Sequence, residues 1–308
     1  MIRTIEDILN ALKDTDKTRI SVAAAQDKTV LKAVYEAYCR NIADFILVGD
    51  EDKIKDALAE LGIDKDNFEI INVEGGLQEQ AEKAVELVSV GEAQVLMKGL
   101  LDTSILLKAL LKKEYGLRTG RTMSITGIFE SPYYHKLFMI TDPAINIKPD
   151  LLQKKQIIEN AVEFSENIGI ENPKVAVLCA KENVDEKMPE TIDARELVAM
   201  NRSGEIQNCI IDGPLAFDNV ISKEAAIHKG IESDVAGDVD IILVPDLVCG
   251  NSLYKSLAYL SEVKMAGVLL GAKVPVIITS RADSKESKLN SIALAAMAGQ
   301  KFKSYKGV

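Results

Sequence analysis

The sequence lacks both a long apolar run and an excess of positive charge. No hydrophobic stretch approaches the roughly 20 residues needed to span a bilayer, and residues 1–7 lack the apolar region of a secretory signal. The formal net charge is -10, and a protein without a broad positive field cannot displace the counterions of a nucleic-acid backbone. We therefore expect a cytoplasmic protein that binds neither membrane nor nucleic acid and holds any anion with a few local cations.

Cysteine is scarce, and its spacing excludes two kinds of site. The four cysteines lie far apart and form no C-x-x-C pair, so the sequence predicts neither a zinc cage nor a redox dithiol. We accordingly expect no metal site. Three of the four lie in or beside apolar patterns, which is typical of buried, reduced thiols. The cysteines are Cys39, Cys179, Cys209 and Cys249.

Histidine and several well-known catalytic motifs are also missing or rare. The sequence has only two histidines, His135 and His228, and neither has a partner pattern beside it, so surface positions are favoured over catalysis. No G-x-S-x-G motif is present, which disfavours a serine hydrolase. G-x-G-x-x-G and G-x-x-x-x-G-K-[ST] are absent as well, which argues against the standard dinucleotide and P-loop sites.

Short β-branched runs alternate with longer amphipathic stretches along the whole chain. Nearly all of the short runs are continuously apolar, which indicates strands covered on both faces. Helical patterns lie between them at 50–61, 77–88, 151–167 and 284–297. The alternation predicts largely parallel, doubly wound sheets. The expected strands are 20–25, 45–49, 68–73, 94–97, 123–129, 137–141, 174–178, 209–211, 241–244 and 274–279.

The length and the pattern together indicate two lobes. A chain of 308 residues exceeds the usual size of one compact core. The pattern is interrupted at 141–149, before a long helical stretch, but no Ser/Gly-rich linker separates the halves. We expect an α/β protein with two doubly wound, largely parallel-sheet lobes, closely joined, and an active-site cleft between them.

Two predicted strands near the end of the sequence are followed by polar residues. Ser280 and Arg281 follow one apolar run, with Asp283 just beyond, and Asp246 follows another. A hydroxyl and a guanidinium at the carboxyl end of a strand, before a helix, form an anion-binding arrangement. A solvated strand-to-helix turn is the alternative. The second such end, followed by Cys249 and Gly250, suggests a shared cleft.

Polar residues also follow a third predicted strand, 94–97. Lys98 is succeeded by Asp102, Thr103 and Ser104 at the start of a helical pattern. The helix-start amides and the hydroxyls of Thr103 and Ser104 could hold a phosphate or carboxylate that Lys98 neutralises. A helix that is merely capped explains the same residues, because Asp102, Thr103 and Ser104 are all good N-caps.

A fourth candidate is the segment 212–219, which follows the predicted strand 209–211. Gly213-Pro214 after a buried strand predicts a fixed turn, and the segment carries more polar groups than a turn requires. Asp218 fits a helix cap as well as it fits a ligand contact.

These segments together resemble the phosphate acetyl/butyryl transferase family. The resemblance is carried by Lys98-Gly99 through Lys108, by 142–150, by Asp212-Gly213-Pro214-Leu215-Ala216-Phe217-Asp218, by Pro245-Asp246 with Gly250-Asn251 and Tyr254-Lys255, and by Val274-Pro275 through Ser280-Arg281. Each motif is weak alone, but their order and spacing extend over most of the chain. The tail from Thr279 to Ser284, with Lys288-Leu289 and 291–294, is similar to the butyryl branch.

The resemblance implies transfer of a short acyl group, butyryl above all, between coenzyme A and inorganic phosphate through a ternary complex. Coenzyme A and phosphate are then substrates, and no cofactor is implied. It also implies that the chain returns to its first lobe near the end, so that the lobes are 1–140 plus 266–308, and 141–265. A homo-oligomer, either a dimer or a higher even assembly, is expected.

The resemblance also implies residue roles. Arg281 is expected to bind phosphate and stabilise the oxyanion, and Ser280 to hydrogen-bond the reacting carbonyl or thiol. One position departs from the acetyl branch, which has an aspartate base seven residues after the serine, where this chain has Ser287. Asp283 and Asp246 are the nearby replacements. The substrate-binding residues expected are Lys98, Thr103, Ser104, Asp246, Gly250, Asn251, Tyr254 and Lys255.

Two alternatives remain open from the sequence. A phosphate acetyltransferase differs from a butyryl enzyme only in chain-length kinetics. A sensor of the same fold that binds coenzyme A thioesters without turnover belongs to a different class, and the presence of Ser280, Arg281 and Asp283 argues against it.

Overall fold

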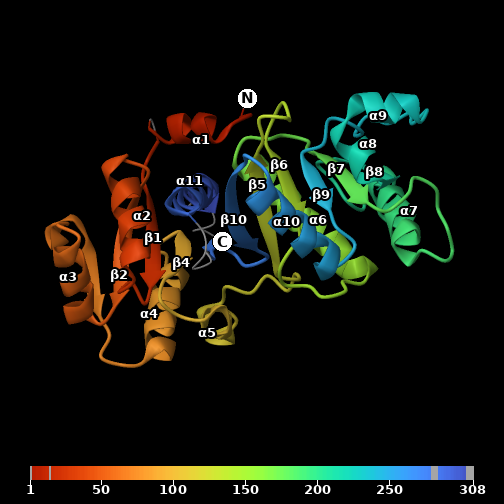
Figure 1. The fold of residues 1–308 in the computed structure, drawn as a ribbon. Helices are drawn as coiled ribbons and strands as arrows, with labels where there is room; N and C mark the ends of the chain where they lie inside the picture. The colour runs from red at the N-terminus through yellow and green to blue at the C-terminus, as the bar shows by residue number, and fades with distance from the viewer. Residues whose placement is uncertain (1, 14, 279–283, 303–308) are drawn as a thin grey trace. The chain divides into compact units, whose positions relative to one another are not determined.

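The computed structural model describes residues 2–13, 15–278 and 284–302, which form two compact units (Figure 1). The terminal unit consists of Ile5–Gly120 and Ala266–Val308, and the central unit of Met1–Thr4 and Arg121–Met265. The chain therefore passes from the terminal unit to the central unit after Gly120, about 20 residues before the expected boundary at 140/141. The reason is local, because the two strands that flank residues 131–137 pair with each other and stay together.

The terminal unit has strands in the order β3-β2-β1-β4-β11-β10. Neighbours run parallel from β3 to β11, and β10 runs antiparallel to β11. The chain adds β2 and β3 on one side of β1 and then places β4 on its other side, so the winding reverses between β1 and β4. The strands are β1 (Thr18–Ala23), β2 (Ala43–Gly49), β3 (Glu69–Asn72), β4 (Val95–Lys98), β10 (Lys264–Leu270) and β11 (Val276–Ile277).

The central strands of the terminal unit are buried along almost their whole length, as their continuous apolar runs predict. Helix α2 packs against α11, and α4 packs against α5. Asp27 and Asp50 cap α2 and α3 by accepting hydrogen bonds from the amides of Val30 (2.8 Å) and Lys53 (3.2 Å). The helices are α1 (Ile5–Leu12), α2 (Lys28–Cys39), α3 (Glu51–Glu60), η1 (Lys65–Asn67), α4 (Leu77–Ser89), α5 (Thr103–Leu110), η2 (Lys113–Tyr115) and α11 (Lys285–Phe302).

The central unit has strands in the order β5-β6-β9-β7-β8. β5 and β6 form an antiparallel pair, and the remaining neighbours are parallel. A register shift between β7 and β8 at Ala176/Leu178 marks a bulge. The strands are β5 (Ser124–Glu130), β6 (Phe138–Thr141), β7 (Lys174–Leu178), β8 (Ile210–Leu215) and β9 (Ile241–Leu243).

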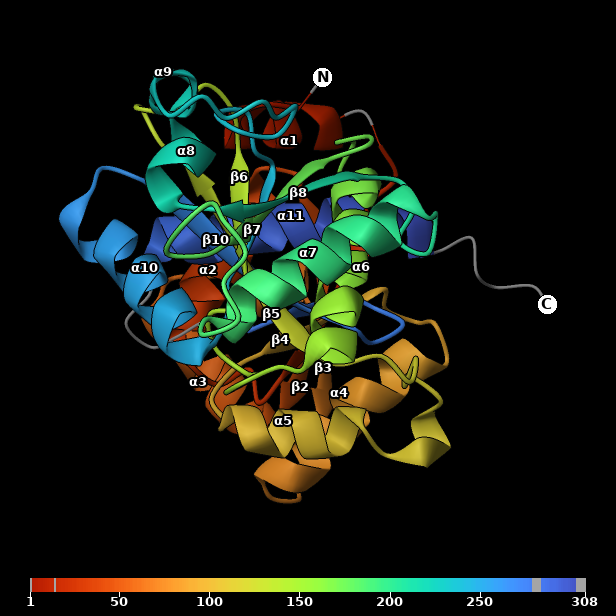
Figure 2. The ribbon, with the colours of Figure 1, turned by 90° about the vertical axis from the view of Figure 1, so that its right-hand side faces the viewer.

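Helices pack around the central sheet. α6 contacts β5, β6 and β9 and lies beside α7 (Figure 2). A capping box starts α6: Asp150 accepts from the amide of Gln153 (2.8 Å), whose side chain accepts from the amide of Asp150 (3.0 Å). The helices are α6 (Leu151–Asn167), α7 (Pro189–Arg202), α8 (Phe217–Ile221), α9 (Lys223–His228) and α10 (Leu247–Leu260).

The structure confirms an α/β fold with largely parallel strands and corrects two local expectations. Strand β10 is absent from the predicted set because Gly267 interrupts its apolar pattern. The expected turn at 212–215 is instead the second half of β8, which runs through the Gly213–Pro214 peptide to Leu215. Of the expected strand 274–279, Val276–Ile277 is a strand, and residue 279 lies outside the described part of the chain. No helix among the described residues is long and apolar enough to cross a bilayer.

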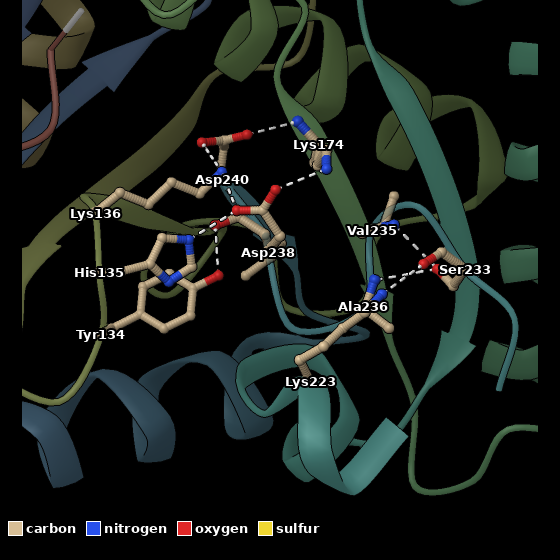
Figure 3. Close-up of polar contacts among 11 residues, drawn as sticks. Tyr134, His135, Lys136, Lys174, Lys223, Ser233, Val235, Ala236, Asp238 and Asp240 are labelled. Atoms are coloured by element: carbon tan, nitrogen blue, oxygen red, sulfur yellow. Dashed lines mark hydrogen bonds and ion pairs between the residues drawn. The ribbon is translucent and has the colours of Figure 1, made fainter. Parts of the chain in front are cut away.

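An ion-pair cluster ties together the amino ends of β6, β7 and β9 (Figure 3). The Asp238 carboxylate contacts Nζ of Lys174 at 2.7 Å, Nζ of Lys136 at 3.0 Å and Nε2 of His135 at 2.8 Å. Asp240 contacts Nζ of Lys136 at 2.7 Å and accepts from the amide of Lys174 at 2.8 Å. Partial burial raises the pKa of Asp238, but hydrogen bonds from Lys174, His135 and Lys136 outweigh it and hold that pKa well below its usual range.

The cluster predicts acid-sensitive stability. A carboxyl group whose pKa is lowered on folding stabilises the native state above its unfolded pKa of about 4, and that stability disappears as the pH falls toward the folded pKa. We expect Asp238→Asn to lower the free energy of unfolding by about 1 kcal/mol at pH 7, a small value because the side chain is partly exposed. In urea titrations, the difference from the unmodified protein should shrink steadily below pH 4.

The matched control is Asp234→Asn, which removes the same charge four residues earlier, at an exposed position. It should change the free energy of unfolding by less than about 0.5 kcal/mol. Equal effects of the two substitutions at every pH would contradict a specific role for Asp238.

Candidate functional site

The loop that follows β6 is built around the buried carboxylate of Asp142, which is 3% exposed. Its Oδ1 accepts hydrogen bonds from the amides of Ile125 (3.2 Å), Ala144 (3.0 Å) and Ile145 (3.3 Å). Its Oδ2 accepts from the amide (2.9 Å) and the Nδ2 group (2.6 Å) of Asn146. These donors satisfy the carboxylate fully, so Asp142 organises the loop.

The start of α10 packs directly on this loop. Asp246 caps the helix by accepting from the amide of Cys249 at 2.8 Å. The Nδ2 group of Asn251 donates to the carbonyl of Pro143 at 3.2 Å. Gly250 is buried so tightly that a Cβ would lie 2.9 Å from the Asp142 carbonyl oxygen. The structure thus brings together three predicted substrate-binding residues, Asp246, Gly250 and Asn251, at one loop.

This group lies at the carboxyl ends of two neighbouring strands. β6 and β9 are parallel, with Thr141 opposite Leu243, so the loops that follow them emerge at the same edge of the central sheet. Ligands of open α/β sheets bind at that edge. The placement supports a substrate role for these loops.

Tyr254 and Lys255, the other two residues predicted on α10, have different surroundings. The half-buried ring of Tyr254 packs edge-on against Phe129 of β5, with centroids 5.3 Å apart. Lys255 is exposed, and its Nζ lies 5.8 Å from the ring of Tyr254 and 5.9 Å from that of Tyr259. Tyr254 therefore anchors α10 on the sheet, whereas Lys255 presents a charge at the surface.

In the terminal unit, Lys98 ends β4 beside the end of β1, with Lys98 opposite Ala23. This is where the winding of the sheet reverses, the position at which open α/β sheets form a binding crevice. Lys98 is 9% exposed, and its Nζ donates to the carbonyl of Leu101 at 3.0 Å. Gly99 presses on the end of β1, since a Cβ there would lie 2.3 Å from the carbonyl oxygen of Ala24. A buried cation therefore sits at the predicted crevice.

Thr103 and Ser104 are the first residues of α5. Asp102 occupies the N-cap position, but its side chain accepts no hydrogen bond from the helix. Simple capping by Asp102 therefore does not account for this segment. The first turn of α5 follows Lys98 by only a few residues, so amides, hydroxyls and a cation lie on one short stretch of chain.

The predicted catalytic residues Ser280, Arg281 and Asp283 lie outside the described residues. The chain on either side of them is placed. Strand β11 runs parallel to β4, and Ile277 lies opposite Met97, one residue before Lys98. After the gap, Ser284 accepts from the amide of Ser287 at 3.0 Å at the start of α11. Ser287, which stands where the acetyl branch has an aspartate, therefore belongs to a helix start.

Comparison with known proteins identifies the family. Residues 3–82 and 73–296 match the model of the family described as "Phosphate acetyl/butaryl transferase". The chain belongs to this family. It is 48% identical over 302 residues to a phosphate butyryltransferase of Clostridium acetobutylicum, covering 98% of this chain and 100% of that protein. It is 46% identical over 279 residues to a phosphate acetyltransferase of Thermotoga maritima, covering 91% and 94% of the two chains.

Solved structures agree with this assignment. A branched-chain phosphotransacylase from Enterococcus faecalis V583 superimposes with a TM-score of 0.82 at 35% identity, covering 92% of this chain and 99% of that one. A phosphotransacetylase from Streptococcus pyogenes gives the same TM-score at 22% identity over 97% and 99% of the chains, which shows a shared fold. Family membership describes the chain as a whole and gives no role to a single residue.

The family segment 212–218 begins on β8, which β7 separates from β9. Asp212 accepts from the neighbouring amide of Gly213 at 2.8 Å, and Asp218 pairs with Lys229 at 2.9 Å. Hydrogen bonding from Lys229 lowers the pKa of Asp218. Asp218 does not cap α8, whose N-cap is Ala216. A hollow of about 350 Å³ borders the segment, and its lining residues are Glu182, Asn183, Asp212, Gly213, Pro214, Leu215, Lys229, Gly230, Ile231 and Glu232.

The thiols are only partly as expected. Cys179 and Cys209 are buried, and burial raises the pKa of each thiol to about 12. Cys249 is half-buried, and burial raises its pKa as well. Cys39 is exposed, so the expectation of burial is wrong for this residue, which ends α2 on its outer side. Within the described ranges, no cluster of His, Cys, Asp or Glu could hold a metal ion.

The residue that sequence reasoning missed is Asp142. It was part of the family segment 142–150 but had no assigned role. An aspartate followed within four residues by an asparagine, directly after a buried strand, is the signal that could have identified it, because such residues commonly bind nearby backbone amides.

The close fit at Gly250 generates a prediction for the loop. In Gly250→Ala, the new Cβ would lie 2.7 Å from Cγ2 of Val244 and 2.9 Å from Cα of Pro143, so backbone must move. We expect a loss of about 1–3 kcal/mol in the free energy of unfolding, measured by urea denaturation. Gly267→Ala is the control, since a Cβ there has nothing within 4 Å. Equal stability of the two variants would show that the loop tolerates movement.

Proposed function

We propose that the protein is a phosphate acyltransferase that moves a butyryl group between coenzyme A and inorganic phosphate. The observation that carries the proposal is family membership over nearly the whole chain, together with 48% identity to a protein named phosphate butyryltransferase. The polar strand ends support it, because transfer between two anionic substrates needs local cations and backbone donors.

The reaction proceeds in one ternary complex. A phosphate oxygen attacks the thioester carbonyl carbon, and the carbonyl becomes a tetrahedral oxyanion. The oxyanion then collapses, the carbon–sulfur bond breaks, and the thiolate leaves and is protonated. The products are butyryl phosphate and coenzyme A, and proximity of the bound substrates lowers the barrier without a covalent enzyme intermediate.

The residue roles follow from this chemistry. Arg281 binds phosphate and offsets the negative charge of the transition state. Ser280 hydrogen-bonds the reacting carbonyl or thiol, and Asp283 receives the proton of the nucleophile. Lys98, with the amides and hydroxyls of Thr103 and Ser104, binds an anionic group of a substrate.

The loops of the central unit bind the acyl-CoA. Asp246, Gly250 and Asn251 shape the surface that the thioester contacts, while Lys255 pairs with a phosphate of the coenzyme and Tyr254 anchors the helix that carries it. No metal or further cofactor takes part. The protein works in the cytoplasm as a homo-oligomer, a dimer or a higher even assembly.

Phosphate acetyltransferase is the second candidate function. The specific observation in its favour is the 46% identity to a protein of that name from Thermotoga maritima. The two functions share one reaction and differ in the acyl chain that the site prefers.

The first test is the dependence of thiol release on phosphate. Incubated with butyryl-CoA, the protein should release free coenzyme A only when phosphate is present, because its cations bind phosphate and do not activate water. Release is followed with a thiol-reactive dye, and butyryl phosphate is trapped with hydroxylamine. Equal release without phosphate would indicate a thioesterase, and no release from any acyl-CoA would indicate a binding protein.

The second test concerns Arg281. Loss of a charge-assisted hydrogen bond costs about 1.5–3 kcal/mol, so Arg281→Ala should lower kcat/KM for phosphate by roughly 10- to 150-fold, with both a higher KM and a lower kcat. Ser280→Ala should lower kcat with little change in the KM for phosphate. Arg202→Ala, at an exposed position of α7, is the control and should leave both constants unchanged. Unchanged kinetics in both site variants would place the phosphate site elsewhere.

A further inference from the structure

Two aliphatic side chains are exposed beside the loop that holds Asp142. Ile147 is 76% exposed and Val248 is 75% exposed. The amide of Leu247 donates to the carbonyl of Ile147 at 3.1 Å, which places the backbones of the two exposed residues next to each other. Single exposed apolar residues are common, but a pair at adjoining backbones is a small apolar surface.

Rigid backbone supports both members of this pair. The Asp142 carboxylate fixes the three amides just before Ile147. Val248 lies in the first turn of α10, which Asp246 caps. Gly250, two residues after Val248, is packed so closely that a Cβ would not fit. The exposed methyl groups are therefore on fixed backbone and have little freedom to fold back onto the protein.

The pair also lies on the edge of the sheet that carries the proposed substrate-binding residues. Ile147 belongs to the loop after β6, and Val248 follows the end of β9, the parallel neighbour of β6. Asp246 is the N-cap of the helix that carries Val248, and Gly250 and Asn251 follow Val248 by two and three residues. An apolar surface among polar substrate contacts fits a ligand that is apolar at one end only.

We propose that Ile147 and Val248 contact the alkyl part of the acyl group and thereby set the chain-length preference. The inference rests on the proposed function and identifies residues of that site that would discriminate between acyl chains. Two side chains offer far less than the roughly 1,000 Å² that a specific protein interface buries, whereas a three-carbon alkyl chain is of matching size. The occupant is therefore a short aliphatic acyl thioester.

The test compares acyl-CoA esters of different length. Butyryl has two methylenes more than acetyl, which corresponds to roughly a 15-fold preference in kcat/KM if both are buried. Ile147→Ala and Val248→Ala should each reduce the butyryl-to-acetyl ratio about fourfold, the value of one methylene. The double variant should reduce it roughly 15-fold, so that the preference for butyryl is lost. The kcat/KM for acetyl-CoA and the KM for phosphate should stay within about twofold.

A larger side chain provides the opposite change. Val248→Phe should lower kcat/KM for butyryl-CoA and valeryl-CoA by more than that for acetyl-CoA, because the ring fills the space of the longer chains. The control is Ile227→Ala on α9, which removes a 64% exposed isoleucine of the same unit and should leave the ratio unchanged. All three positions are exposed, and thermal melting should confirm that the variants remain folded.

The outcomes separate the inference from the proposed function. If the unmodified protein transfers acyl groups to phosphate but the ratio is the same in every variant, or acetyl and butyryl rates fall together, the inference is wrong and the proposed function stands. If the unmodified protein shows no phosphate-dependent transfer, both are wrong. If Val248→Ala converts an oligomer to smaller species in sedimentation without changing the ratio, the surface binds a second copy of the chain and the inference is overturned.

Discussion

The buried carboxylate of Asp142 is the constraint on which the proposed acyl-CoA surface depends. A carboxylate with so little exposure is stable only when hydrogen bonds replace its hydration. Here the loop wraps around it, and four backbone amides and one side-chain amide supply the donors. The loop conformation in turn supplies the carbonyl of Pro143 to Asn251 and that of Ile147 to Leu247. The start of α10 is thus held against a loop that one charged group organises.

The charged groups at the two edges of the central sheet have different partners. At the amino ends of β6, β7 and β9, the cluster of Asp238 and Asp240 with Lys136 and Lys174 pairs its charges internally. At the carboxyl ends of β6 and β9, the carboxylates of Asp142 and Asp246 accept hydrogen bonds from backbone amides, and the side chains of Ile147 and Val248 are exposed. Charges that are already paired contribute to stability, whereas exposed groups on rigid backbone are suited to binding. The edge that carries these exposed groups is the one at which open α/β sheets generally bind ligands.

The sequence predicts the fold well where apolar runs are long and polar residues follow them. The ends of β4 and β9 are identified in this way, and Asp246, Gly250 and Asn251 lie together at the loop that follows β6. Where the prediction from sequence fails, the cause is physical. β10 is missed because a glycine interrupts its pattern, and the second half of β8 resembles a turn because Gly-Pro normally ends a strand. The role of Asp142 depends on amides that are specified only once the loop has folded.

The carboxylates of the site also bear on how the nucleophile is activated. Family enzymes of the acetyl branch are expected to use an aspartate where this chain has Ser287, which takes part in the start of α11. Asp142 is fully hydrogen-bonded, and Asp246 caps α10. Both carboxylates already accept hydrogen bonds from backbone amides. In the proposed mechanism, the proton of the nucleophile goes to Asp283 or remains on a phosphate that is already largely deprotonated at neutral pH. Either route assigns the main catalytic role to the binding and orientation of phosphate, which is why a single arginine is expected to affect both affinity and turnover.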